Sequence, residues 1–333
     1  MPVPLAVPAA VVSLVSLLAG AAMSGQSAGP TTGPATQPAA IVEAEGPIMV
    51  EVAESALYVN AMGRAKPAIP EFPALEPKPG HVRGHVRDVH GKPLKGARIG
   101  IRSSAVGGGY SGAQGVTNAE GYYEFEVPWG ACHFYNAGYA IDWGEDGRAA
   151  LGLHPADGEL DSFASADGCV ENFVLLPWGV GDRDGAQDNP GYAGNYYGGA
   201  IHVDYSVSEG RVFDQPTDLP PDATIELTLT PKTPLLDGSA GRAIVVRKRV
   251  GTRFYVLNLP VAAYEISAKL ADGTALKMRE TGPYSNNAFG LAPKEARGTA
   301  TLLFRPDSAK AEMATPAHGN WQSIDITLSR PES

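Results

Sequence analysis

Short segments in which apolar and polar residues alternate recur along most of the chain. The stretch HVRGHV at 81–86 places Val82 and Val86 on one face and His81, Arg83 and His85 on the other, which is the period of a half-buried strand. Further strand-like segments lie at 97–102, 122–127, 131–139 and 169–177. Glycine and proline turns separate them, so the pattern predicts a β-rich unit at 79–178, with the glycine-rich stretch 105–115 as a loop.

The C-terminal half repeats this kind of pattern. Seven strand-like runs lie at 200–207, 224–231, 242–250, 253–260, 263–270, 299–306 and 323–331. Residues 253–270 can be laid on the first unit so that Pro260 falls on Pro128 and Ile266 on Phe134, and Pro234-Leu235 with Gly238 echoes Pro93-Leu94 with Gly96. We therefore predict a second β-sandwich at 200–333, a degenerate copy of the first.

The remaining segments have different compositions. Residues 1–22 carry no charged side chain and end in Ala19-Gly20-Ala21, which is typical of an export signal with an A-x-A cleavage site. Residues 23–78 form a Pro/Ala-rich linker, within which 47–62 is expected to be one short helix or an added edge strand. Residues 140–168 are expected to be loop, and 179–199 a Gly/Asp/Tyr-rich linker.

Turn residues in the first unit carry a family resemblance. The order G-x-V-x-D-x-x-G-K-P-L-x-G-A at 84–97, T-N-A-E-G-Y-Y at 117–123 and V-P-W-G at 127–130 resembles the carboxypeptidase regulatory-like domain. The resemblance implies a transthyretin-like β-sandwich of about seven strands and says almost nothing about activity. The predicted fold class is all-β, with two tandem transthyretin-like or immunoglobulin-like sandwiches.

Charge and cysteine content limit the partners and the compartment. The formal net charge of -10 argues against nucleic acid and against an acidic membrane surface, since both need a basic protein face. Membrane attachment is expected only if the N-terminal signal stays uncleaved. Cys132 and Cys169 are the two cysteines, and in an exported protein they predict one disulfide, with two buried free thiols as the alternative.

The histidine-rich stretch at 80–99 has two interpretations. Zinc binding by His81 and His85 is excluded, because four strand residues span about 13 Å and zinc ligands lie at about 2.1 Å from the ion. We expect instead a strand, turn and strand that form the first hairpin of the sandwich. Its polar face, His81, Arg83, His85 and Arg87, would be a basic stripe that is either solvated or binds an anionic partner as pH falls through about 6.5.

Two other clusters are candidate binding sites. Aromatic residues in loops, interleaved with Asp, Asn and Gly, suit sugar rings but also suit the buried end of a sandwich; they are Trp143, Trp178, Tyr192, Tyr196 and Tyr197. Asp182, Asp184 and Asp188 with Gly185 are a weak calcium candidate, and a solvated linker is the alternative.

Enzyme signatures are missing from the sequence. The opening strand and turn pattern is also similar to the intradiol ring-cleavage dioxygenases, which hold ferric iron with two tyrosines and two histidines. The paired histidines of that family are not present, because the candidates His133, His154, His202 and His318 are isolated. We predict no catalytic residue and no cofactor. The chain is expected to be an exported interaction or scaffolding protein of the cell envelope that binds a protein, or alternatively a polysaccharide-binding module protein.

Overall fold

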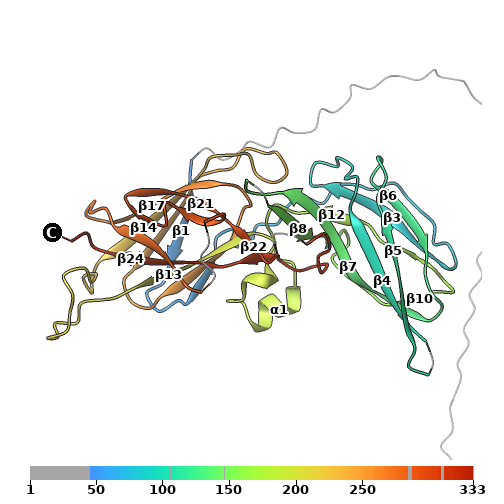
Figure 1. Ribbon diagram of the computed structural model, residues 1–333, viewed down its shortest axis with the longest axis horizontal. Helices are drawn as coiled ribbons and strands as arrows, with labels where there is room; N and C mark the ends of the chain where they lie inside the picture. The colour runs from blue at the N-terminus through green and yellow to red at the C-terminus, as the bar shows by residue number, and fades with distance from the viewer. Residues whose placement is uncertain (1–45, 106, 146, 284–286, 309–310, 333) are drawn as a thin grey trace, which may run out of the picture. The chain divides into compact units, whose positions relative to one another are not determined.

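The computed structural model describes residues 46–105, 107–145, 147–283, 287–308 and 311–332. Within these ranges the fold is all-β, with two β-sandwiches and two short helices, α1 (Arg183–Asp188) and η1 (Ala193–Asn195). The predicted fold class is therefore confirmed (Figure 1). The predicted signal at 1–22 lies outside the described residues.

The first sandwich is built from two sheets that share one core. One contains β10 (Phe163–Ala164), β7 (Ala131–Asp142), β4 (Arg98–Ser104) and β5 (Tyr110–Val116) in this order, with β8 (Arg148–Gly152) also on β7. The other contains β11 (Cys169–Val170), β3 (His81–Asp88), β12 (Phe173–Leu175) and β9 (His154–Pro155), with β6 (Tyr122–Glu126) on β3. Buried side chains such as Val82, Ile99, Ile101 and Phe173 fill the space between them.

The strands β3 and β4 were predicted to pair as a hairpin, and that prediction is wrong. β3 pairs with β6, β11 and β12, whereas β4 pairs with β5 and β7, so the connection between them crosses from one sheet to the other. The turn itself forms as expected, because the Asp88 carboxylate accepts from the backbone N–H groups of His90 at 2.9 Å and Lys92 at 3.0 Å. Local turn chemistry fixes the reversal of the chain but not which sheet the next strand joins.

Two segments predicted as loop contain strands. The edge strand β5, Tyr110–Val116, begins inside the glycine-rich stretch 105–115 and ends one residue beyond it. Gly115 is required there, because an added Cβ would lie 2.2 Å from the Phe125 ring of the opposite sheet. The 140–168 insertion contains β8, β9 and β10, of which β8 pairs with the end of β7.

The second sandwich also has two sheets. One has the order β1 (Ile48–Val52), β15 (Ile244–Arg249), β14 (Thr224–Pro231), β17 (Tyr264–Leu270), β21 (Thr299–Leu303) and β19 (Gly290–Ala292). The other has the order β2 (Tyr58–Asn60), β16 (Phe254–Leu259), β13 (Gly199–Tyr205), β24 (Ile324–Ser329), β18 (Lys277–Thr281) and β20 (Glu295–Arg297). The short pair β22 (Arg305–Pro306) and β23 (Trp321–Gln322) completes this half.

Strand pairing is repeated between the two sandwiches. β3 lies between antiparallel β6 and parallel β12, and β13 lies between antiparallel β16 and parallel β24. Likewise β4 pairs with β5 and β7, and β14 pairs with β15 and β17, all antiparallel. The predicted match of Pro260 with Pro128 fits this correspondence, because Pro128 lies between β6 and β7 and Pro260 lies between the equivalent strands β16 and β17. The predicted match of Pro234 with Pro93 does not fit, because Pro93 lies between β3 and β4 whereas Pro234 lies between β14 and β15.

The segment 23–78 was predicted to be a linker, but residues 48–60 belong to the second sandwich. β1 pairs in parallel with β15, and β2 pairs in parallel with β16, so residues 48–60, which we call the strap, add one edge strand to each sheet. Lys248 holds the turn between these strands, with its ammonium group donating to the carbonyls of Ala53 at 2.7 Å, Glu54 at 2.6 Å and Ala56 at 3.2 Å. The edge-strand alternative for 47–62 is confirmed.

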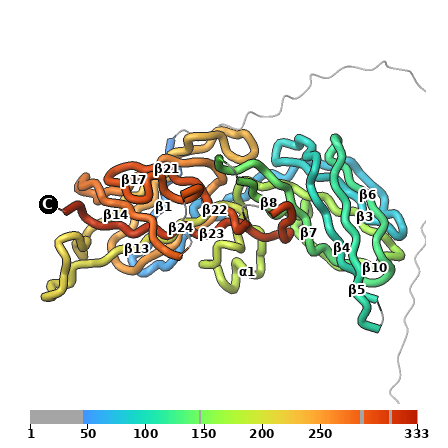
Figure 2. Tube along the Cα trace, viewed as in Figure 1, coloured from blue at the N-terminus to red at the C-terminus, as the bar shows by residue number. Residues whose placement is uncertain are grey.

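The strap makes the first sandwich an insertion within the second. The chain leaves the second sandwich after β2 and re-enters it at β13 (Figure 2). Both connections meet at Asn258, which is 1% exposed with φ 60°. Its side-chain amide donates to Asn60 Oδ1 at 3.0 Å and accepts from the Gly179 N–H at 2.7 Å.

The two cysteines are free thiols, so the predicted disulfide is not formed in this structure. Cys132 lies on β7 and Cys169 on β11, in opposite sheets of the first sandwich. The Cys132 thiol is fully buried and faces the carbonyls of Pro128 at 3.7 Å and Gly130 at 3.8 Å. Burial raises the pKa of the Cys169 thiol to about 12, which keeps it protonated.

Candidate functional site

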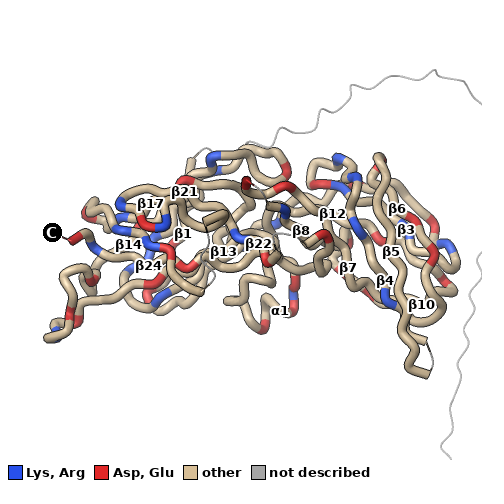
Figure 3. Tube along the Cα trace, in the orientation of Figure 1, with Lys and Arg blue, Asp and Glu red and all other residues tan. Residues whose placement is uncertain are grey.

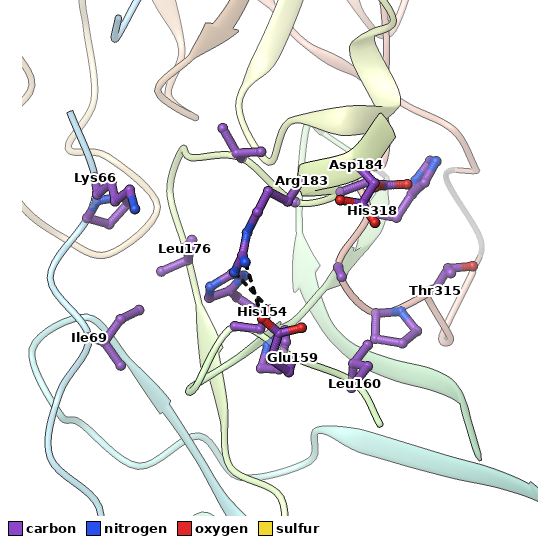
Figure 4. A pocket seen from close by; sticks show the side chains of 18 of the residues that line it. Lys66, Ile69, His154, Glu159, Leu160, Leu176, Arg183, Asp184, Thr315 and His318 are labelled. Carbon is purple, nitrogen blue, oxygen red and sulfur yellow. Dashed lines mark hydrogen bonds and ion pairs between the residues drawn. The ribbon is translucent and has the colours of Figure 1, made fainter. Parts of the chain in front are cut away.

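A cleft of about 580 Å³ lies where four segments of the chain meet. These are the extended segment 65–69 after the strap, the turn 154–160 that follows β8, the segment 176–184 with the start of α1, and the segment 315–318 (Figure 4). The last of these comes from the second sandwich and packs on the first, where the Ala317 N–H donates to the Leu153 carbonyl at 3.0 Å. The walls therefore come from both sandwiches.

Apolar side chains form much of the wall of this cleft. The lining includes Ile69, Val180, Leu160 and Leu176. Of these, Ile69 is 41% exposed and Val180 is 39% exposed. Uncovered aliphatic surface inside a concave site lowers the free energy of binding for an apolar group by about 25 cal/mol per Å² buried. The cleft is thus suited to an aliphatic or aromatic group.

His154 is held as a neutral imidazole at the edge of the cleft. Its Nδ1 lies 3.1 Å from the Tyr197 hydroxyl, and the two rings meet edge to face with centroids 5.6 Å apart. Burial and then the positive charge of Arg183 lower the pKa of His154 to about 4. At neutral pH this residue contributes a polar hydrogen-bonding group and no charge.

Charged groups surround the mouth of the cleft. Arg183 reaches from the start of α1 toward His154 and Glu159, and its guanidinium lies 3.1 Å from the Glu159 carboxylate (Figure 4). Asp182 caps α1 by accepting from the Gly185 N–H at 2.7 Å. With Lys66 and Asp184, the lining has three carboxylates and two cations.

The calcium candidate is not supported by the geometry. Asp182 uses its carboxylate as a helix cap, and Asp184 and Asp188 follow within α1. No group of three or more His, Cys, Asp or Glu side chains in the described ranges is arranged to hold a metal ion. In this segment, Arg183 pairs with Glu159 at the cleft, and Asp182 caps the helix that carries Arg183.

The five predicted sugar-binding aromatics do not form one platform. Tyr196 and Tyr197 are each 4% exposed, Trp143 donates from its indole to the Phe304 carbonyl at 2.8 Å and packs on Trp321, and Trp178 is half-buried. Only Tyr192 is well exposed, at 52%, and its ring packs against His318 of the cleft. Most of these rings stabilise the junction between the sandwiches.

Other aromatic rings are far more exposed and were missed. Tyr110 is 74% exposed and Trp129 is 70% exposed. Both lie beside the end of β4, where Ser104 pairs with Tyr110 and Ser103 donates to the Trp129 carbonyl at 3.0 Å. Both Trp129 and Trp178 stand in a Pro-Trp-Gly sequence, which predicts only the end of a strand. The local sequence therefore does not show that Trp129 is exposed and Trp178 half-buried.

The predicted basic stripe on β3 is largely covered. His85 is 9% exposed and packs against the Tyr122 ring, with the two ring planes tilted by 55°. Arg83 lies 3.7 Å from Glu124, and Arg87 donates to the Glu71 carbonyl at 3.1 Å while lying over the Phe72 ring. The segment 71–76 and β6 thus occupy the face that was expected to be open. Acidic and basic residues are interspersed along both sandwiches (Figure 3).

None of the described residues that line the cleft is a serine or cysteine nucleophile. His154 is half-buried and forms a hydrogen bond with the Tyr197 hydroxyl, Glu159 pairs with Arg183, and Asp182 caps α1. Nucleophilic catalysis needs a nucleophile within hydrogen-bonding reach of a base.

No helix in the described ranges has the length and apolar character needed to cross a membrane.

Comparisons with known proteins give only weak similarities. No protein-family model and no curated protein matches the chain. Among solved structures, the Bacillus anthracis TIE protein is 14% identical over 76% of this chain with a TM-score of 0.28, and a Streptococcal ancillary pilin is 14% identical over 76% with a TM-score of 0.22. The chain spans less than two thirds of these proteins, 34% and 62% of their lengths. An adhesin of Mobiluncus mulieris is 10% identical over 72% of this chain and 86% of its own, with a TM-score of 0.24.

Proposed function

We propose that this chain is an exported, non-catalytic interaction protein of the cell envelope, which binds an apolar group of a partner protein in the cleft. The observation that carries this proposal is the uncovered aliphatic wall at Ile69 and Val180, inside a concave site that two sandwiches form together. The neutral His154 and the ion pair of Arg183 with Glu159 supply the few polar groups that orient a ligand.

The family resemblance of residues 79–178 is part of the same proposal. We infer a carboxypeptidase regulatory-like domain there, and the residues of the resemblance act as turn builders. Gly121 has φ 72°, and a Cβ at this position would lie 2.5 Å from the Val86 carbonyl. Asn118 accepts from the N–H groups of Glu120 at 3.1 Å and Tyr122 at 2.9 Å. These roles support an architectural and not a catalytic use of the motif.

A peptide-display selection on the purified chain tests the cleft. We expect enriched peptides to carry an aromatic or branched aliphatic side chain, and binding to be lost in Val180→Arg, which puts a charge on the apolar wall. Val116→Arg is the matched control, because Val116 is 54% exposed on β5, outside the cleft. Selection of no peptide, or binding that survives Val180→Arg, would refute the proposal.

Polysaccharide binding is the second candidate, and the exposed rings of Tyr110 and Trp129 favour it at a new position. Flat aromatic faces open to solvent suit the apolar faces of sugar rings. In a pull-down with insoluble polysaccharides, Trp129→Ala should abolish retention and Trp178→Ala should not. Retention on no polymer, or equal loss in both variants, would exclude this site.

A further inference from the structure

The loop after β13, residues 206–219, presents two apolar side chains to solvent. Val212 is 96% exposed and Phe213 is 87% exposed, the highest values among the large hydrophobic residues that the structure describes. The loop is found by its yellow colour at the end of β13, on the side of the second sandwich away from α1 (Figure 1). Neighbouring apolar side chains that are almost fully open to solvent are the kind of surface that a partner can cover.

Internal hydrogen bonds hold this loop in shape. The Asp214 carboxylate accepts from the Ser208 hydroxyl at 2.7 Å and from the N–H groups of Gly210 at 2.6 Å and Arg211 at 3.1 Å. These bonds lower the pKa of Asp214, with the Ser208 hydroxyl as the largest cause. At the base of the loop, the backbone N–H of Ser208 donates to the Leu219 carbonyl at 2.9 Å, and Leu219 is fully buried. The tip is therefore preorganised, which reduces the entropy cost of docking it.

From these observations we propose that the tip, Val212-Phe213, of one copy of this chain docks in the cleft of a second copy. The inference rests on the proposed function, because it uses the same cleft. A cleft of about 580 Å³ has room for both side chains, and its wall offers Ile69 and Val180, which are still uncovered. Arg211, which adjoins the tip, is paired with Glu209, so the part of the loop offered to the cleft is the apolar pair Val212-Phe213.

A membrane is a less suitable partner for this loop. Glu209, Asp214 and Asp218 outnumber the single cation Arg211, so the loop as a whole is acidic. An anionic bilayer attracts basic segments and repels acidic ones.

The proposed contact joins two different surfaces of the same chain. Tip and cleft lie on separate parts of the molecule, so each copy can use its tip on one neighbour and its cleft on another. Such a head-to-tail contact produces rings or open chains of subunits instead of a closed pair. Two anchoring side chains make a small interface, so we expect a dissociation constant between micromolar and millimolar.

Sedimentation velocity over a concentration series up to about 1 mM tests the inference. The wild type should form dimers and then longer species, and Phe213→Ser should raise the dissociation constant about ten- to a hundredfold. Val180→Arg and Ile69→Arg, which change the cleft, should do the same. Val116→Arg should associate like the wild type, and unchanged melting temperatures will show that each variant is folded.

Mixing two defective variants gives the decisive result. Phe213→Ser keeps an intact cleft and Val180→Arg keeps an intact tip, so an equimolar mixture should form heterodimers and nothing larger. A wild type that stays monomeric would overturn the inference. Association that depends on Phe213 but not on Val180 and Ile69, or binding of the tip to phosphatidylglycerol vesicles in place of self-association, would also overturn it. Peptide binding to the cleft would still stand in these cases, so the two proposals fail separately.

Discussion

Buried ionisable side chains in and near the first sandwich make its stability depend on pH. His154 lies at the cleft with its pKa lowered to about 4, first by burial and then by Arg183. Glu171, between β11 and β12, has its pKa raised to about 8, first by burial and then by the Asp157 carboxylate. The pH windows of the two groups, about 4 to 6.5 for His154 and about 4.5 to 8 for Glu171, overlap, and within them the two groups change stability in opposite directions.

For His154 we expect stability to fall as the solution is acidified. The unfolded chain takes up this proton near pH 6.5 and the folded protein only near pH 4, so the free energy of unfolding drops between these values by up to about 3 kcal/mol. Urea unfolding of the wild type and of His154→Gln at pH 7, 5.5 and 4 isolates this contribution, because the opposing effect of Glu171 is present in both proteins. Relative to the wild type, His154→Gln should gain stability between pH 7 and pH 4, while His81→Gln serves as the control; equal slopes in all three proteins would contradict the assignment.

For Glu171 we expect the opposite sign. The folded protein keeps this proton up to about pH 8, whereas the unfolded chain releases it near pH 4.5, so stability is lost as pH rises through this window, by up to about 5 kcal/mol. Glu171→Gln should raise the melting temperature at pH 9 and change it little at pH 4. The exposed Glu126→Gln on β6 is the matched control, and a gain for Glu171→Gln that is the same at both pH values would show that charge is not the cause.

Residues that act through their own neighbours in sequence were predictable, and those that act across the fold were not. Asp88 and Asn118 build turns from backbone groups two and four positions away, so their role follows from turn chemistry. Tyr196 and Tyr197 stand in a glycine-rich linker that suggests exposure, yet both are buried. Their burial depends on segments distant in sequence, which a local pattern does not contain.

At the level of elements, the strap depends on a single buried ammonium group. Lys248 is 2% exposed and satisfies three carbonyls between β1 and β2. Burial lowers its pKa, and the three bonds compensate for the desolvation of the charge. Lys248 thus fixes the turn between β1 and β2, where the chain passes from one sheet of the second sandwich to the other.

Replacing this lysine should loosen the strap. Lys248→Met leaves three carbonyls without their donor, so we expect a loss of about 2–4 kcal/mol in the free energy of unfolding and faster amide hydrogen exchange at residues 48–60. Lys269→Met is the control, since Lys269 is 51% exposed on β17. Unchanged exchange in the strap of Lys248→Met would show that the strand pairing alone holds it.

Alternation identified most long strands and gave no information on their partners. The runs at 200–207, 224–231 and 263–270 correspond to β13, β14 and β17 because their inward residues are apolar. β5 was missed, since its small residues and glycines show no apolar alternation. The hairpin of β3 and β4 was wrong because one turn sequence serves both a hairpin and a crossing between sheets.

At the scale of the whole molecule, the first sandwich is an insertion whose two ends converge on Asn258. This geometry lets one domain be removed without opening the other. If residues 64–178 are replaced by a short Gly-Ser linker, the second sandwich should still fold with a cooperative melting transition. Deleting residues 46–62 from that shortened chain should instead destabilise it strongly, because both sheets lose an edge strand. A shortened chain that fails to fold, or one that tolerates loss of the strap, would contradict the insertion.

Local patterns were sufficient to predict the fold class, because alternation, turn glycines and prolines, and the absence of helical periodicity agree along the chain. The same patterns placed most strands of both sandwiches. Three features became visible only in three dimensions: the strap belongs to the distant sandwich, the cysteines are unpaired, and the cleft lies between segments far apart in sequence. Each of these depends on contacts between residues far apart in sequence, such as Ala53 with Lys248 and Leu153 with Ala317, and no local pattern specifies which distant partner a segment meets.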